Sequence, residues 1–132
     1  MKEIEKVTLV RGLPGSGKST YAKKMGIFHI ESDMYFYRNG IYTYDPLCIS
    51  TAHYWCKKTF ENACLCGIEC VVSNTFTQKW ELEPYIKIAE GLGYTIEIIC
   101  MKGKYGNIHN VPKEILEQME NRFEQIDGEI FV

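Results

Sequence analysis

Short apolar runs alternate along the chain with segments in which apolar residues recur at helical spacing. The apolar runs predict strands at residues 7–10, 28–31, 70–74 and 95–101. The helical spacing predicts helices at residues 18–25, 51–65, 82–89 and 111–124. Because strands that are separated by helices pair in parallel and are covered on both faces, the pattern predicts an α/β fold of three layers around a mostly parallel central sheet.

The segment from Tyr35 to Cys48 interrupts this alternation. It contains the turn signals Asn39-Gly40 and Asp45-Pro46, so we expect a loop. The loop is dense in aromatic residues, namely Tyr35, Phe36, Tyr37, Tyr42 and Tyr44. Two interpretations are open: the rings form a platform on which an unpaired base stacks, or they form a small core that fastens the loop to the sheet.

Residues 12–19 lie between the first predicted strand and helix and form a complete G-x-x-x-x-G-K-[ST] phosphate-binding loop. In this context the backbone N–H groups of the loop and the start of the helix form an anion site for nucleotide phosphates. The motif assigns Lys18 to the β- and γ-phosphates of ATP and the Ser19 hydroxyl to Mg²⁺. The predicted contacts to ATP come from Gly12, Leu13, Pro14, Gly15, Ser16, Gly17, Lys18, Ser19 and Thr20. The predicted fold is therefore that of a P-loop NTPase or kinase.

The length and charge of the chain limit the number of domains and the kinds of ligand that we expect. The 132 residues fit one domain, 1–132. The net charge of −2, from 15 basic and 17 acidic residues, gives no overall field that would attract nucleic acid, so such binding requires a local patch. The sequence has no apolar run long enough for a membrane span and no signal segment near Met1, so we expect no membrane contact and a cytoplasmic location.

The six cysteines contain no C-x-x-C pair. Cys56 and Cys64 fall on the same helical face as Ala52 and Phe60, which makes them small buried apolar groups. We therefore expect all six thiols to be reduced and free of metal.

Polar residues follow the predicted strands at the edge where ligands bind in parallel sheets. Asp33 follows the second strand and is either a general base or partner of Mg²⁺ facing the γ-phosphate, or a carboxylate that caps a turn. Ser73-Asn74-Thr75 follows the third strand, where P-loop enzymes usually have an aspartate. This trio either positions a metal-bound water or simply ends the strand.

Several motifs in order give the chain a family resemblance. They are residues 11–20, Ile30-Glu31-Ser32-Asp33, Ala52-His53-x-Trp55, Ser73-Asn74-Thr75, Trp80-Glu81 and Asn107-x-His109-Asn110-Val111-Pro112. Over residues 6–124 the chain resembles the P-loop kinase domain of the polynucleotide kinase group and its small bacterial and phage relatives. The resemblance implies that Asp33 activates the 5′-hydroxyl of a nucleic acid, and that Ser19 and Asp33 lie at the metal.

The resemblance also implies a lid over about residues 102–111, whose arginines grip the transferring phosphate. Gly106 stands where such an arginine is expected, which leaves Lys102 and Lys104 as the cations of the lid. Lysine supplies a point charge but not a bidentate fork, so stabilisation of the transition state is weaker or differently placed.

The acceptor is expected above Asp33. Met34 replaces a second acidic residue of the family, and Arg38 takes the place of an arginine expected near Phe36. His53 is either a contact to substrate phosphate or an exposed polar residue. The predicted substrate-binding residues are Arg38, Tyr35, His53 and Asn74.

The sequence as a whole favours an ATP-dependent kinase that uses Mg²⁺ and moves the γ-phosphate to a hydroxyl, on a single-stranded nucleic-acid end or a nucleotide. Lys18 and Mg²⁺ on Ser19 neutralise the developing charge, while Asp33 takes the acceptor proton. A small-molecule kinase remains an alternative, as does a nucleotide-dependent binding module with weak ATPase activity. The lid glycine and the missing aspartate favour the binding module.

Overall fold

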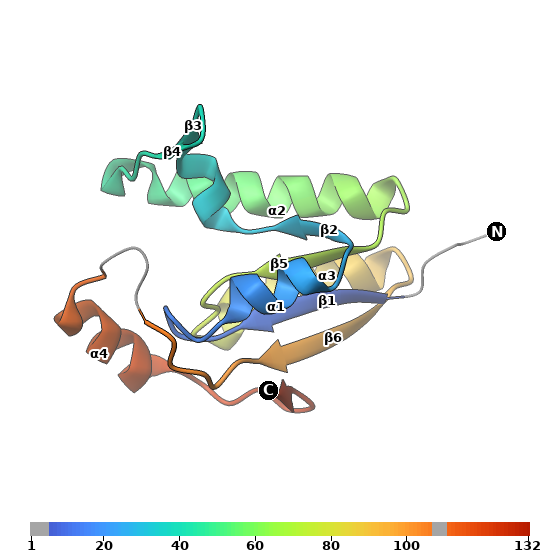
Figure 1. The fold of residues 1–132 in the computed structure, drawn as a ribbon. Helices are drawn as coiled ribbons and strands as arrows, with labels where there is room; N and C mark the ends of the chain where they lie inside the picture. Colours follow the sequence, from blue (N-terminus) through green and yellow to red (C-terminus); the bar gives the residue numbers. More distant parts are fainter. Residues whose placement is uncertain (1–5, 107–110) are drawn as a thin grey trace.

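The computed structural model describes residues 6–106 and 111–132 (Figure 1). Five strands form one sheet in the order β2 (Phe28–Ile30), β5 (Cys70–Ser73), β1 (Lys6–Arg11), β6 (Thr95–Cys100) and β7 (Ile130–Phe131). All pairings between these strands are parallel, with Leu9 of β1 opposite Val72 and Ile98. The predicted α/β fold with a largely parallel central sheet is confirmed.

Helices cover both faces of the sheet, because the buried strands alternate their apolar side chains between two cores. Val7 and Leu9 of β1 point to the core shared with α2 (Ile49–Leu65) and α3 (Lys79–Gly91). Val10 points to the opposite core, against Ala22 of α1 (Lys18–Lys24). The last helix, α4 (Lys113–Arg122), lies beyond the carboxyl ends of the strands (Figure 1).

The segment predicted as a loop contains regular structure. It consists of the 3₁₀ turns η1 (Ser32–Phe36) and η2 (Pro46–Cys48), with a hairpin of β3 (Tyr37–Arg38) and β4 (Ile41–Tyr42) between them. Asn39 and Gly40 both have positive φ, at 52° and 79°, which is the conformation of a two-residue hairpin turn. The turn signal was therefore correct, but it joins two paired strands.

A buried ion pair fastens the C-terminal segment to the end of β1. Arg11 is fully buried, and its Nη1 donates to Glu129 Oε1 at 2.8 Å. Its other N–H groups donate to the carbonyls of Phe76, at 2.9 Å, and Thr77, at 3.2 Å, while the guanidinium lies 4.0 Å from the ring centroid of Phe123. These contacts hold the short strand β7, which the sequence pattern did not predict, beside β6.

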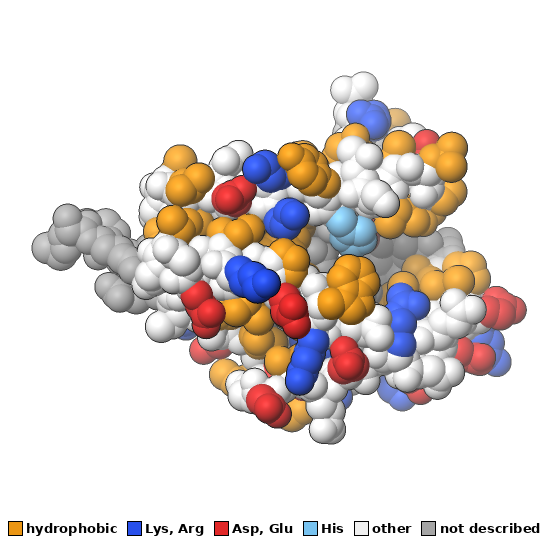
Figure 2. All heavy atoms as spheres, turned by 180° about the vertical axis from the view of Figure 1, so that it is seen from behind, with side chains coloured by type: hydrophobic (Ala, Val, Ile, Leu, Met, Phe, Trp, Pro, Cys, Tyr) orange, Lys and Arg blue, Asp and Glu red, His pale blue; other side chains and the backbone are white. Residues whose placement is uncertain are grey.

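The face of the molecule shown in Figure 2 carries no single dominant charge. Acidic and basic side chains are interspersed on the face shown in Figure 2. In the part of the chain that the structure describes, no helix is long and apolar enough to cross a membrane. Cys56 and Cys64 lie in the core, as their helical spacing predicts.

Candidate nucleotide and phosphoryl-transfer site

The phosphate-binding loop leaves β1 after Arg11 and enters α1 at Lys18. Gly15 and Gly17 adopt positive φ values of 82° and 92°, which a side chain would strain. Lys18 Nζ lies 3.4 Å from the Leu13 carbonyl oxygen. Burial lowers the pKa of the Lys18 ammonium, while the nearby carboxylates of Glu31 and Asp33 oppose this shift. The loop therefore holds its lysine beside two carboxylates.

Glu31, at the carboxyl end of β2, is a residue to which the sequence analysis gave no role. Its Oε2 accepts a hydrogen bond of 2.6 Å from the Ser19 hydroxyl and one of 3.1 Å from the Ser73 hydroxyl. His29 Nε2 lies 2.6 Å from Ser73 Oγ, and burial lowers the pKa of this imidazole against the opposing effect of Glu31. A chain of hydrogen bonds thus connects His29, Ser73, Glu31 and Ser19. The signal for Glu31 was its place at the ligand-binding edge of the sheet.

Asp33 lies in η1 and faces the same cleft as the phosphate loop. The Tyr42 hydroxyl donates to Asp33 Oδ1 at 3.3 Å. Burial, followed by the charge of Asp33, raises the pKa of the Tyr42 phenol, so this tyrosine stays neutral and able to donate. The hairpin of β3 and β4 therefore supports the carboxylate through Tyr42.

These groups line a cleft of about 740 Å³. Its floor is formed by the phosphate loop, and its walls by polar groups of Glu31 and Asp33 and by the rings of Phe36, Tyr42 and Tyr44. Pro112 and Ile115 close it from the start of α4. A cleft of this size, largely apolar with a few convergent polar groups, is typical of small-molecule and cofactor sites.

The lid is described only in part, since residues 107–110 lie outside the described residues. Tyr105 and Gly106 line the cleft, and the Tyr105 N–H donates to the Gly15 carbonyl at 2.7 Å. A Cβ placed on Gly15 would collide with the Gly106 carbonyl oxygen. The beginning of the lid thus packs directly on the phosphate loop.

Two pairs of predicted site residues lie outside this cleft. Tyr35 packs on Trp55, with ring centroids 6.2 Å apart, and the Arg38 guanidinium lies 5.9 Å from the centroid of Tyr35. Lys102 Nζ lies 4.9 Å from the ring centroid of Phe131. Neither Lys102 nor the exposed Lys104 is among the residues that line the cleft. Within the loop after β2, it is Phe36, Tyr42 and Tyr44 that face the site.

Asn74 and His53 both contact Ser32, the residue before Asp33. Asn74 Oδ1 accepts from the Ser32 N–H at 2.9 Å, and His53 Nδ1 lies 3.1 Å from Ser32 Oγ. Asn74 is buried, whereas His53 is exposed at the rim of the cleft. These contacts tie the ends of β5 and α2 to the turn that presents Asp33.

A phosphate loop, its lysine and two carboxylates at one edge of a parallel sheet define a P-loop nucleotide-binding protein with a kinase fold. The chain belongs to the AAA domain family, which matches residues 7–104. It is 30% identical over 138 residues to human NEDD4-binding protein 2, a match that covers 90% of this chain. This chain spans only 8% of the length of that relative.

Solved kinase structures share the fold. A gluconokinase from Sinorhizobium meliloti 1021 superposes with a TM-score of 0.66 at 16% identity, covering 98% of this chain and 82% of the gluconokinase. A chain of the Pnkp1/Rnl/Hen1 RNA repair complex superposes with a TM-score of 0.69 at 15% identity, covering 98% of this chain and 48% of the other. At these identities the likeness establishes the fold alone.

Proposed function

We propose that the chain binds ATP with Mg²⁺ and transfers the γ-phosphate to the 5′-hydroxyl of a nucleic acid or nucleotide. The observation that carries the proposal is that Lys18, Ser19 and Asp33 line one cleft with the aromatic wall of Tyr42 and Tyr44. The loop and its lysine suit the nucleotide phosphates, and the carboxylate suits a general base. The aromatic wall suits an acceptor with a planar ring.

The residues present fit Mg²⁺. The Ser19 hydroxyl and the carboxylates of Glu31 and Asp33 are oxygen donors, which this cation prefers. Bound there, Mg²⁺ would supply charge neutralisation at the β- and γ-phosphates. Glu31 takes over the carboxylate function that the chain lacks after β5, where Ser73 instead donates to it.

The roles of the protein groups follow from their positions. Lys18 places a positive charge at the end of the phosphate loop, and Asp33 accepts the proton of the attacking hydroxyl. Tyr42 holds Asp33 through its hydroxyl. Lys104 is the lid cation best placed to approach the phosphates, because its neighbour Tyr105 donates to Gly15 and also lines the cleft.

Transfer of labelled γ-phosphate tests the proposal. ATP and Mg²⁺ are supplied with three acceptors in parallel: a 5′-hydroxyl oligonucleotide, a nucleoside and gluconate. We expect the oligonucleotide or the nucleoside to be labelled. Labelling of gluconate alone would instead establish a small-molecule kinase, which the fold of the S. meliloti gluconokinase favours as the second candidate. Hydrolysis of ATP without labelling of any acceptor would contradict both kinase activities.

A further inference from the structure

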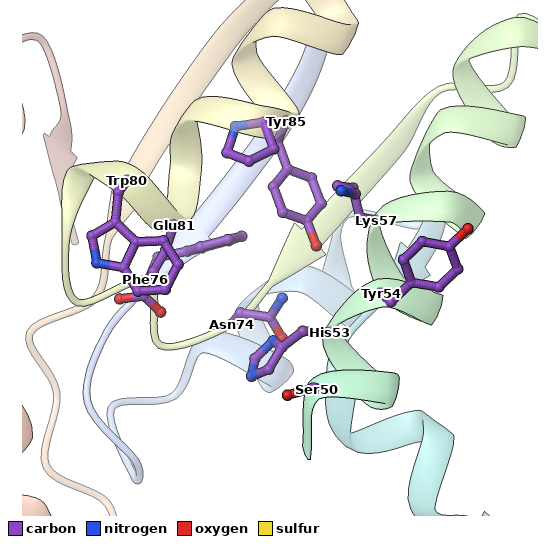
Figure 3. A pocket seen from close by; sticks show the side chains of 10 residues that line it. Ser50, His53, Tyr54, Lys57, Asn74, Phe76, Trp80, Glu81 and Tyr85 are labelled. Atoms are coloured by element: carbon purple, nitrogen blue, oxygen red, sulfur yellow. The ribbon is translucent and has the colours of Figure 1, made fainter. Parts of the chain in front are cut away.

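A second pocket, of about 390 Å³, lies between α2 and α3 (Figure 3). It shares His53 and Asn74 with the nucleotide cleft, so the two hollows adjoin at the turn that presents Asp33. Figure 3 shows Tyr54 and Lys57 on the α2 side and Trp80 on the α3 side, with Asn74 and His53 near one another between them. The pocket is therefore a continuation of the acceptor side of the cleft.

Two large aromatic side chains of this pocket are exposed to solvent. Trp80 is 66% exposed and Tyr54 is 60% exposed. The indole Nε1 of Trp80 donates to Gln78 Oε1 at 3.0 Å, which satisfies its polar edge within the protein and leaves the ring face available. An exposed ring whose polar edge is satisfied in this way is suited to stacking against a planar ligand.

The pocket also contains a cation without an acidic partner. Lys57 forms no ion pair in residues 6–106 and 111–132, and its ammonium lies 5.8 Å from the ring centroid of Tyr54. Its neighbour Lys58, by contrast, pairs with Glu61 at 3.1 Å. The one carboxylate in the pocket, Glu81, accepts from the Thr77 hydroxyl and the Gln78 N–H. The ammonium of Lys57 is thus available to pair with a negatively charged group of a ligand.

We propose that this pocket binds the second nucleotide of the acceptor, with its base stacked on Trp80 and the phosphodiester that precedes it facing Lys57 and His53. Stacking rings with a nearby cation are the combination that holds single-stranded nucleic acid without sequence preference. The inference rests on the proposed function and narrows its acceptor from any 5′-hydroxyl nucleotide to a chain of at least two nucleotides.

Fluorescence of Trp80 tests the proposal without any phosphoryl transfer. The chain has two tryptophans, and Trp55→Phe leaves Trp80 as the only one. The 5′-hydroxyl dinucleotide thymidylyl-thymidine is titrated into this variant in the absence of ATP. Thymidine and a dinucleotide with an abasic second position serve as comparisons. We expect the dinucleotide to quench Trp80, whereas thymidine and the abasic compound leave its emission unchanged.

Substitutions extend the test to affinity. Trp80→Ala is expected to weaken binding of the dinucleotide by roughly 5- to 150-fold, as loss of one base stack does, and to leave the affinity for thymidine unchanged. Lys57→Ala is expected to weaken dinucleotide binding and to reduce its dependence on salt. Lys58→Ala, the matched control, is expected to change neither, because Lys58 lies outside the pocket and is paired with Glu61.

The outcomes separate this inference from the proposed function. An unquenched Trp80 at millimolar dinucleotide, or an equal loss of thymidine binding in Trp80→Ala, would overturn the pocket assignment. If the chain self-associates and Trp80→Ala abolishes the association, the surface belongs to a contact with a second copy, and the pocket assignment is overturned as well.

Phosphorylation of the dinucleotide distinguishes the inference from the kinase activity. If Trp80→Ala phosphorylates the dinucleotide with the same KM as the wild type, the inference fails but the proposed kinase activity stands. If the dinucleotide quenches Trp80 but receives no phosphate from ATP, the result supports the pocket assignment and contradicts the proposed kinase activity.

Discussion

The hydroxyl of Ser19 donates a 2.6 Å hydrogen bond to Glu31 Oε2. The phosphate-binding motif assigns this hydroxyl to Mg²⁺, so the contact brings a carboxylate from the end of β2 to the expected metal position. Ser73, on the neighbouring strand, donates to the same oxygen at 3.1 Å. The chain therefore has a carboxylate beside the Ser19 hydroxyl, although none follows β5.

Glu31→Gln tests this assignment. The amide keeps the size of the side chain but removes its charge, so we expect the stimulation of ATP binding by Mg²⁺ to fall about 10- to 100-fold. ATP affinity in the presence of a chelator should change little. Isothermal titration with and without Mg²⁺ measures both. The control is Glu97→Gln, which removes a half-buried carboxylate that pairs with Lys6 on the sheet, away from the cleft. An unaltered Mg²⁺ effect in Glu31→Gln would remove Glu31 from the metal site.

Lys18→Ala tests the phosphate loop. Lys18 is expected to contact only the β- and γ-phosphates, so its loss should weaken ATP binding by about 10- to 100-fold and AMP binding hardly at all. Titration calorimetry of both nucleotides supplies the comparison. Lys24→Ala, at the exposed end of the same helix, is the control. Equal ATP affinities of the wild type and Lys18→Ala would contradict the role of the loop.

Asp33→Asn separates binding from chemistry. The asparagine keeps the size of the carboxylate but does not accept a proton, so we expect single-turnover transfer to a 5′-hydroxyl oligonucleotide to fall at least ~10²-fold. ATP affinity should remain that of the wild type. Tyr42→Phe removes the hydroxyl that donates to Asp33 but keeps the carboxylate, so it should slow transfer far less. If Asp33→Asn transfers at a similar rate to the wild type, Asp33 is not the base.

Arg11→Met tests the buried ion pair. The substitution leaves the Glu129 carboxylate, which is 3% exposed, without its partner, so we expect the free energy of unfolding to drop by about 3–5 kcal/mol. Urea denaturation measures the change. Lys6→Met breaks the partly exposed pair with Glu97, at the surface of the sheet, and should cost no more than about 1 kcal/mol. Similar decreases in the free energy of unfolding of the two variants would show that the burial of the Arg11–Glu129 pair contributes nothing to stability.

The sequence predicted the parts of the fold that follow from burial. Strands covered on both faces become continuous apolar runs, which is why β1 and β5 were found within a residue or two. The strand β7 was missed because its two residues are too few to form a pattern, and a distant side chain, Arg11, holds its segment. The hairpin was missed for the same reason, although Asn39-Gly40 marked its turn.

Side-chain direction limited the prediction of the site. The strand ends placed Asp33 and Asn74 at the correct edge, because that edge follows from the parallel topology alone. Which rings of the aromatic segment face the cleft depends on the turn between β3 and β4, and this turn directs Tyr42 inward while Tyr35 packs on Trp55. Glu31 received no role because P-loop enzymes usually have an aspartate after the strand that corresponds to β5, whereas Glu31 follows β2.

The contact between Arg11 and Glu129 joins residues separated by almost the whole chain. Proteins are synthesised from the N-terminus, so β1 and the phosphate loop leave the ribosome long before Glu129 is added. Until then the Arg11 guanidinium has carbonyl partners on the segment after β5 but no counter-charge. A nascent chain therefore lacks the counter-charge of Arg11, the last residue of β1 before the phosphate loop, until residue 129 has been added.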